Sequence, residues 1–147
     1  MTDSRHKRTT FTAKRLPRIL MLWAPVVAWM VLIFLLSAQS QYPTPKSRIL
    51  DLLIEKTAHT VEYAILAALL VRALRPSRSS SRSMYAIAIL AASVYALSDE
   101  FHQKFVPGRS ADWADILFDW IGAMIGAALA LYCFEPSGKM FGRPPKP

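Results

Sequence analysis

One uncharged block constrains this chain more than any other feature. Residues 19–39, ILMLWAPVVAWMVLIFLLSAQ, contain no Asp, Glu, Lys or Arg. About 20 apolar residues are enough for a helix to cross the hydrocarbon core of a bilayer, because each residue adds about 1.5 Å. The block therefore predicts a membrane-spanning helix. A secretory signal peptide is the alternative, but its apolar core is typically only about 7–15 residues long, so we favour a retained helix.

Three further segments have the length and composition of spanning helices. They cover about residues 52–74, 83–102 and 112–134. The purely apolar part of the first of these, residues 64–71, is too short to cross a bilayer, so that helix must include the polar stretch EKTAHTVEY. We predict an all-α, four-transmembrane-helix bundle over residues 19–134, a polytopic membrane protein with polar tails at residues 1–18 and 135–147.

The basic residues indicate how the four helices are oriented. The tail before residue 19, the connection 72–82 and the tail after residue 134 lie on one side of the predicted bundle, and they hold thirteen of the 18 Lys and Arg residues. Cytoplasmic segments of membrane proteins carry such an excess. We therefore predict that both termini, and both tails, are cytoplasmic. The net charge of +8 does not indicate nucleic acid as a partner, because the basic residues flank apolar blocks and form no stripe with aromatic residues.

The acidic residues have the opposite distribution and concentrate near the stretch SDEFHQKFVPGRSADWADILFDW, residues 98–120. At 100° per residue, the polar side chains of the second, third and fourth helices each fall on one arc. The three arcs lie at a similar depth, and we predict that they enclose a hydrated pocket in the outer leaflet. Its predicted members are Glu55, Lys56, His59, Tyr63, Asp99, Glu100, Gln103, Arg109, Asp115 and Asp119.

The position of Asp119 supports a shared pocket. It follows Asp112 and Asp115 at helical spacing, and Gly122 and Gly126 continue the same seam as helix-packing positions. A charged side chain exposed to lipid at the centre of a helix costs about 2.5–3.5 kcal/mol, so these acids must face each other, cations or water.

Structural roles remain open for part of this set. Lys56, His59, Asp115 and Asp119 fit an ion-pair network that only holds helices together, although ionisable groups inside membranes are functional by default. Asp112 fits a cap of the fourth helix, and Lys104 fits a solvated loop position.

Metal and cofactor signatures are absent from the sequence. The single cysteine excludes a Cys-based metal cluster and an intramolecular disulfide, and there is no HExxH or comparable spacing. We therefore predict no metal site and no cofactor, with His59, His102 and a carboxylate as the weaker alternative. No catalytic residue is identified.

Two stretches resemble the VanZ-like family of integral membrane proteins: EKTAHTVEY, and DEFHQKFVPGRSADWADILFDWIGAMIG with its specific element Gln103…Pro107-Gly108-Arg109-Ser110…Asp115. The resemblance covers about residues 19–134 and includes FLLSAQSQYP at the end of the first block. It implies an envelope protein of the bacterial cytoplasmic membrane, in a family whose namesake is associated with resistance to the glycopeptide teicoplanin. Where the family pattern has Asn, this chain has Asp119, an extra acid that needs a cation, a proton or a different ligand.

Three functions are compatible with these features. The first is binding of a lipid-linked headgroup or cell-wall precursor, with Arg109 and Lys56 on its phosphate or carboxylate and membrane lipids as partners. The second is a hydrolase or transferase in which His59, with Asp115 or Asp119, acts as general base and Arg109 stabilises an anion. The third is a small ion- or proton-coupled transporter, which would need a homo-oligomer and is disfavoured because the inner halves of the spans are nearly uncharged.

Overall fold

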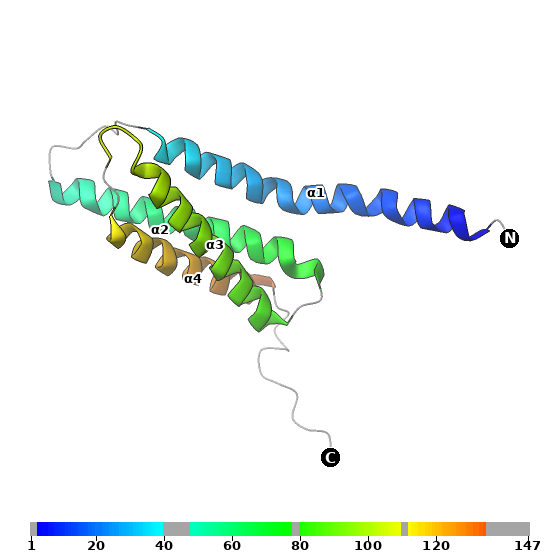
Figure 1. The fold of residues 1–147 in the computed structure, drawn as a ribbon. Coiled ribbons are helices and arrows are strands. Elements are labelled where there is room, and N and C mark those ends of the chain that lie inside the picture. Colours follow the sequence, from blue (N-terminus) through cyan, green and yellow to red (C-terminus); the bar gives the residue numbers. More distant parts are fainter. Residues whose placement is uncertain (1–2, 40–47, 78–79, 110–111, 135–147) are drawn as a thin grey trace, which may run out of the picture.

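The chain forms four long helices in the computed structural model (Figure 1). They are α1 (Asp3–Ser37), α2 (Arg48–Leu74), α3 (Ser81–Gln103) and α4 (Trp113–Phe134), with a short 3₁₀ helix, η1 (Arg75–Ser77), after α2. The structure describes residues 3–39, 48–77, 80–109 and 112–134. The predicted loop at residues 41–47 and the predicted tail at residues 135–147 lie outside these ranges.

Each long helix contains a segment that can cross a membrane by length and composition. These segments are Pro17–Ser37, Leu52–Leu74, Ser81–Gln103 and Trp113–Phe134. The prediction of an all-α bundle with four spanning helices is therefore confirmed, and no strand occurs in the described ranges.

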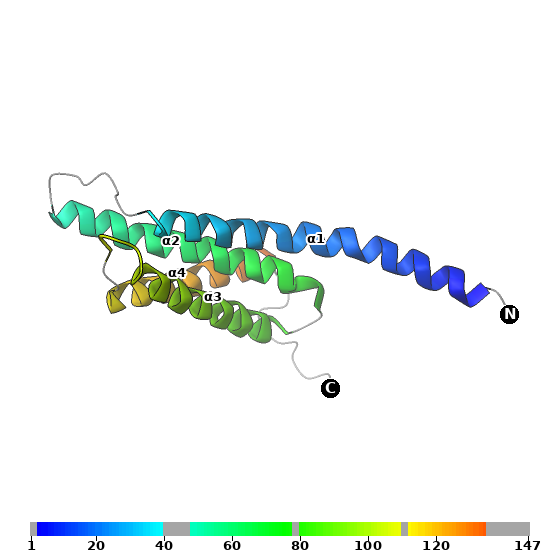
Figure 2. The ribbon, with the colours of Figure 1, turned by 45° about the horizontal axis from the view of Figure 1, so that its top comes forward.

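The first helix differs from the sequence prediction at both ends. It ends at Ser37, two residues before the predicted boundary, and it continues backwards through the basic tail to Asp3. No Gly or Pro precedes Pro17 in this segment, so no backbone breaker separates the tail from the span. Figures 1 and 2 both show the N-terminal part of α1 projecting beyond the other three helices.

Helices α2 and α4 form the most extensive interface of the bundle. Gly122 and Gly126 make this approach possible. A Cβ atom on Gly122 would overlap the carbonyl oxygen of Thr60, and one on Gly126 would overlap that of Ala64. Both glycines therefore bring the backbone of α4 against that of α2, as small residues do at membrane helix interfaces.

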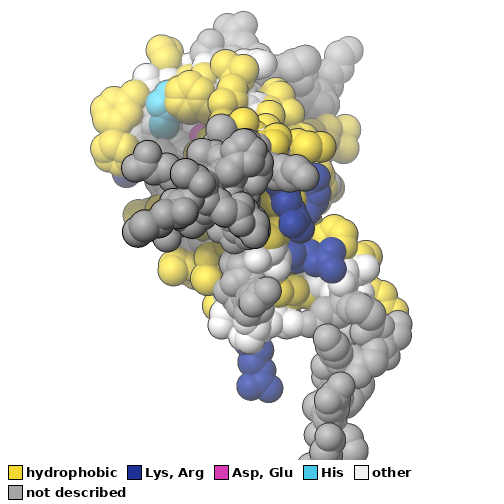
Figure 3. All heavy atoms as spheres, turned by 90° about the vertical axis from the view of Figure 1, so that its right-hand side faces the viewer, with side chains coloured by type: hydrophobic (Ala, Val, Ile, Leu, Met, Phe, Trp, Pro, Cys, Tyr) yellow, Lys and Arg dark blue, Asp and Glu magenta, His cyan; other side chains and the backbone are white. Residues whose placement is uncertain are grey.

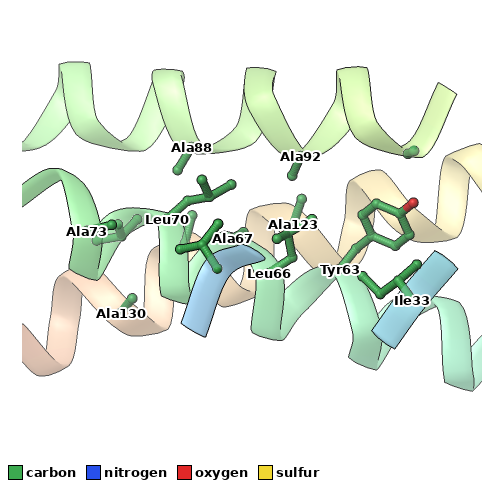
Figure 4. Packing of buried hydrophobic residues seen from close by; sticks show 14 residues of the cluster. Ile33, Tyr63, Leu66, Ala67, Leu70, Ala73, Ala88, Ala92, Ala123 and Ala130 are labelled. Atoms are coloured by element: carbon green, nitrogen blue, oxygen red, sulfur yellow. The ribbon is translucent and has the colours of Figure 1, made fainter. Parts of the chain in front are cut away.

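The apolar core lies in the half of the bundle away from the predicted polar pocket, and it consists mainly of small side chains. Ala88 and Ala92 of α3 face Leu66, Ala67 and Leu70 of α2 (Figure 4). Ala123, Ala127 and Ala130 bring α4 into the same cluster, and Val26 and Ile33 bring in α1. The larger apolar side chains of all four helices are exposed on the outside, as expected of a surface that contacts lipid.

The buried polar and charged side chains of the described residues all lie at one end of the bundle, which we call the polar end: Ser37, His59, Asp99, Glu100, Gln103, Asp115 and Asp119. This end is formed by the last turns of α1 and α3, the connection to α4, and the first half of α2 and α4. Figure 3 views the opposite end, where Lys and Arg side chains appear between hydrophobic ones. The two ends of the bundle thus differ in charge.

Candidate functional site

Lys56 joins α2 to the start of α4 at the polar end. Its Nζ atom lies 2.6 Å from Oδ1 of Asp115 and 3.0 Å from Oδ2 of Asp112. Asp115 is almost fully buried, whereas the Asp112 side chain is half exposed. The ammonium therefore sits between a buried and a solvated carboxylate, and both of its ion pairs connect the same two helices.

His59 forms the second connection between α2 and α4. Its Nδ1 atom lies 2.9 Å from Oδ1 of Asp119, and both side chains are buried. The other ring nitrogen, Nε2, lies 3.9 Å from Oδ1 of Asp115. A carboxylate on one ring nitrogen fixes the orientation of an imidazole and leaves the other nitrogen to bind a proton, a substrate or a metal.

A chain of hydrogen bonds runs from α1 through α3 to the connection before α4. Ser37 donates its hydroxyl to Oδ1 of Asp99 at 2.6 Å, and Gln103 donates Nε2 to Oδ2 of the same carboxylate at 3.0 Å. Arg109 in turn donates from a terminal nitrogen to Oε1 of Gln103 at 2.9 Å. Gln103 thus couples a buried carboxylate to a partly exposed guanidinium.

The position of Arg109 depends on a tight turn. The N–H of Arg109 donates to the carbonyl oxygen of Val106 at 3.1 Å, so residues 106–109 form a four-residue turn. Pro107 supplies the fixed φ of its first central position, and Gly108, at φ 83°, supplies the left-handed second one. The Pro-Gly dipeptide therefore directs Arg109 back toward α3.

Glu100 and Asp112 connect the two networks. The Glu100 carboxylate accepts a hydrogen bond from the backbone N–H of Asp112. Asp112 caps α4, because its Oδ1 accepts the N–H of Ala114 at 3.0 Å. That N–H and the Lys56 ammonium hold the pKa of the Asp112 carboxyl below its ordinary value. Asp112 therefore has both a capping and an ion-pairing role.

The remaining predicted residues take different positions. Tyr63 is fully buried, its ring lies 6.3 Å from that of Tyr95, and its hydroxyl has no hydrogen-bond partner among the described residues. Figure 4 shows it at the edge of the apolar core, between α3 and the segment of α1 that contains Ile33. Glu55 is exposed rather than enclosed, although its carboxylate remains near His59 and Asp115.

Two other residues of the predicted corner stand apart from the hydrogen-bonded networks. Lys104 is exposed, with its Nζ atom 5.9 Å from the ring centre of Phe101. The His102 ring lies 4.5 Å from that of Phe34 and outside the group formed by Glu55, His59 and Asp115. The alternative metal site from His59, His102 and a carboxylate therefore has no geometric support.

Two participants were not identified from the sequence. Ser37 lies in the stretch FLLSAQSQYP, where its hydroxyl is no more conspicuous than that of its neighbours, and only the approach of α1 to α3 brings it to Asp99. Glu62 lies one helical turn after His59 on the polar arc of α2, and its side chain is half buried. Helical spacing places Glu62 on that arc, but it was not included among the predicted members of the pocket.

Carboxylates outnumber cations at the polar end. Five carboxylates are buried or half buried: Glu62, Asp99, Glu100, Asp115 and Asp119. The cationic or potentially cationic side chains that are ion-paired or hydrogen-bonded into these networks among the described residues are Lys56, His59 and Arg109. The side chains of His102 and Lys104 lie outside the networks. Such an excess in a region of low dielectric constant requires a bound cation, a cationic or hydroxylated ligand, or protons.

Comparison with protein families gives a match over most of the chain. A sequence model of the VanZ/LLP1 family matches residues 19–134 of the chain. These residues include the four spanning segments except for the first two residues of the first one. No curated protein and no solved structure gives a significant match.

Proposed function

This chain belongs to the VanZ/LLP1 family of membrane proteins, and from that premise we propose that it binds the headgroup of a lipid-linked molecule, such as a cell-wall precursor, at the outer face of the bacterial cytoplasmic membrane. The observation that carries the proposal is the convergence of charged side chains from α2, α3, α4 and the 104–109 connection at one end of membrane-spanning helices. Placing ionisable side chains inside a membrane costs free energy, and such side chains are therefore typical of functional sites.

The charges of the polar end suggest which headgroups fit. Arg109 is a planar cation with five N–H donors, which suits the oxygens of a phosphate or carboxylate. The surrounding carboxylates suit hydroxyl or ammonium groups on the same headgroup. Lys56 is a weaker anion ligand than the sequence indicated, because its ammonium is already held by Asp112 and Asp115.

The apolar exterior offers a place for the chain of such a lipid. Large side chains such as Leu97 and Phe101 of α3 are exposed beside the polar end. A prenyl or acyl chain lying on this surface would keep the attached headgroup at the depth of Arg109. Transport is disfavoured, because the described buried side chains in the other half of the bundle are apolar and offer no polar path.

The orientation of the bundle is a separate prediction. The asymmetry of Lys and Arg predicts that the polar end faces outward and that both termini are cytoplasmic. Reporters fused to the C-terminus, each active on only one side of the membrane, test this directly. A C-terminus located outside would put the site on the cytoplasmic face, where an extracellular glycopeptide has no access to it.

Replacing Arg109 by lysine tests the headgroup site. We expect the variant to fold and to bind the headgroup about 10- to 100-fold more weakly, because it loses one charge-assisted hydrogen bond of a bidentate pair, worth roughly 1.5–3 kcal/mol. The measurement is mass spectrometry of the lipids that remain on purified protein. In cells, the same variants are compared for glycopeptide susceptibility at matched expression.

Lys104→Ala is the matched control, because it removes a neighbouring cation that is exposed and lies outside the network. We expect it to retain the same lipids as the wild type. If Arg109→Lys also retains them, the bidentate anion site does not exist.

A further inference from the structure

We propose that Glu55, His59 and Asp115 form a binding site for one divalent transition-metal ion of the zinc type. Each residue can offer one ligand atom, and the three atoms lie within 4.8 Å of one another. Glu55 and His59 are four residues apart on α2 and therefore share a face, and Asp115 approaches them from the first turn of α4. This site goes beyond the proposed binding of a headgroup and does not depend on which lipid is bound.

The orientation of His59 is the observation that points to a ligand. The side chain is only 6% exposed, and Nδ1 is fixed by Asp119 at 2.9 Å. Nε2 lies 3.9 Å from Oδ1 of Asp115, which is beyond hydrogen-bond distance. Metal-binding histidines commonly donate their second N–H to a carboxylate in this way, which fixes the tautomer and raises the basicity of the coordinating nitrogen.

The set of donors suits a particular class of metal. One imidazole and two carboxylates are ligands that Zn²⁺ and its first-row neighbours accept, and three protein ligands leave a further position for water or an oxygen of the headgroup. Metal–ligand bonds of about 2.0–2.2 Å require the three atoms to move closer together. The exposed side chain of Glu55 has room for this movement and gives the ion a route from solvent.

Lys56 acts as a competitor in this arrangement. Its ammonium lies 2.6 Å from Oδ1 of Asp115 and compensates part of the charge that a metal would neutralise. Asp112, at 3.0 Å from the same ammonium, can keep Lys56 on its solvent side when a metal takes Asp115. We therefore expect that removing the charge of Lys56 strengthens metal binding. Removing one of the three metal ligands should instead weaken it.

The test uses full-length purified protein in detergent, stripped with a chelator and titrated with Zn²⁺, with bound metal also measured by elemental analysis. We expect one ion per chain, a loss of at least tenfold in affinity for Glu55→Gln and for His59→Ala, and a 10- to 100-fold loss for Asp119→Asn. Lys56→Met should bind more tightly than the wild type. His102→Ala is the control and should bind like the wild type.

Glu55→Gln keeps the test valid if His59→Ala does not fold. Glu55 is exposed, and its side chain forms no hydrogen bond or ion pair with another described residue that would hold the helices together. Failure of wild-type protein to bind Zn²⁺, or unchanged binding by Glu55→Gln, would overturn the metal site. The titration contains no lipid ligand. Either result would therefore leave the proposed headgroup site to its own test, the mass spectrometry of retained lipids.

Discussion

Gly126→Ala is expected to push α2 and α4 apart and to lower the free energy of unfolding by at least roughly 1–3 kcal/mol, the usual cost of overpacking. The added Cβ would overlap the carbonyl oxygen of Ala64, which belongs to the backbone and cannot rotate away. Gly122→Ala should act in the same direction through the carbonyl oxygen of Thr60. The measurement is thermal unfolding of the purified protein in detergent.

A wider separation of α2 and α4 would also affect the polar end. Gly122 lies one turn after Asp119 on the same seam of α4, so a wider separation at this level also lengthens the His59–Asp119 contact. Ala128→Val is the control, because residue 128 is on the exposed face of α4 and the added methyl groups meet only lipid or detergent. A melting temperature for Gly126→Ala equal to that of the wild type would show that the two helices do not approach this closely.

The second large effect is expected from breaking the buried pair of His59 and Asp119. His59→Leu in metal-free protein should cost about 3–5 kcal/mol, because it leaves a carboxylate buried without its partner. The double variant His59→Leu/Asp119→Leu should regain much of this loss, since apolar replacement of both partners is often neutral. Unfolding of the wild type, His59→Leu, Asp119→Leu and the double variant, as a mutant cycle, measures the coupling.

Asp119→Asn is the conservative control for this cycle. An amide at this position can still accept a hydrogen bond from His59 through its oxygen, so we expect folded protein with a loss of at most about 1.5 kcal/mol. If His59→Leu is no less stable than Asp119→Asn, the two side chains are not an interacting buried pair in the membrane protein.

The sequence predicted the fold because membrane helices impose simple requirements. Four segments of about 20 residues, one of them uncharged and three with a polar face, left few alternatives to a four-helix bundle. The start of α1 was not predicted, because the charged tail before residue 19 cannot lie in the hydrocarbon core of a membrane. Charge limits a membrane span, whereas the helix itself ends only where backbone or capping signals stop it.

The candidate site was predictable only in outline. Helical spacing placed Lys56, His59, Asp115 and Asp119 on facing arcs, but periodicity does not specify which atoms meet. The pairing of Lys56 with Asp115 and of His59 with Asp119 follows from the close approach of α2 and α4 at Gly122 and Gly126. The role of Ser37 depends on how α1 packs, which no local pattern encodes.

The distinction between a binding site and an ion-pair lock is the central issue for this protein. The most direct measurement is the thermal unfolding of delipidated wild-type protein and Arg109→Lys, each with and without bacterial polar lipids fractionated by headgroup. A ligand at 100 times its dissociation constant stabilises the folded state by about 2.7 kcal/mol. We expect one fraction to raise the melting temperature of the wild type by more than that of Arg109→Lys, with equal melting temperatures in the absence of lipid. A lower melting temperature for lipid-free Arg109→Lys, with no fraction stabilising the wild type, would contradict the proposal and identify the polar end as a structural lock between helices.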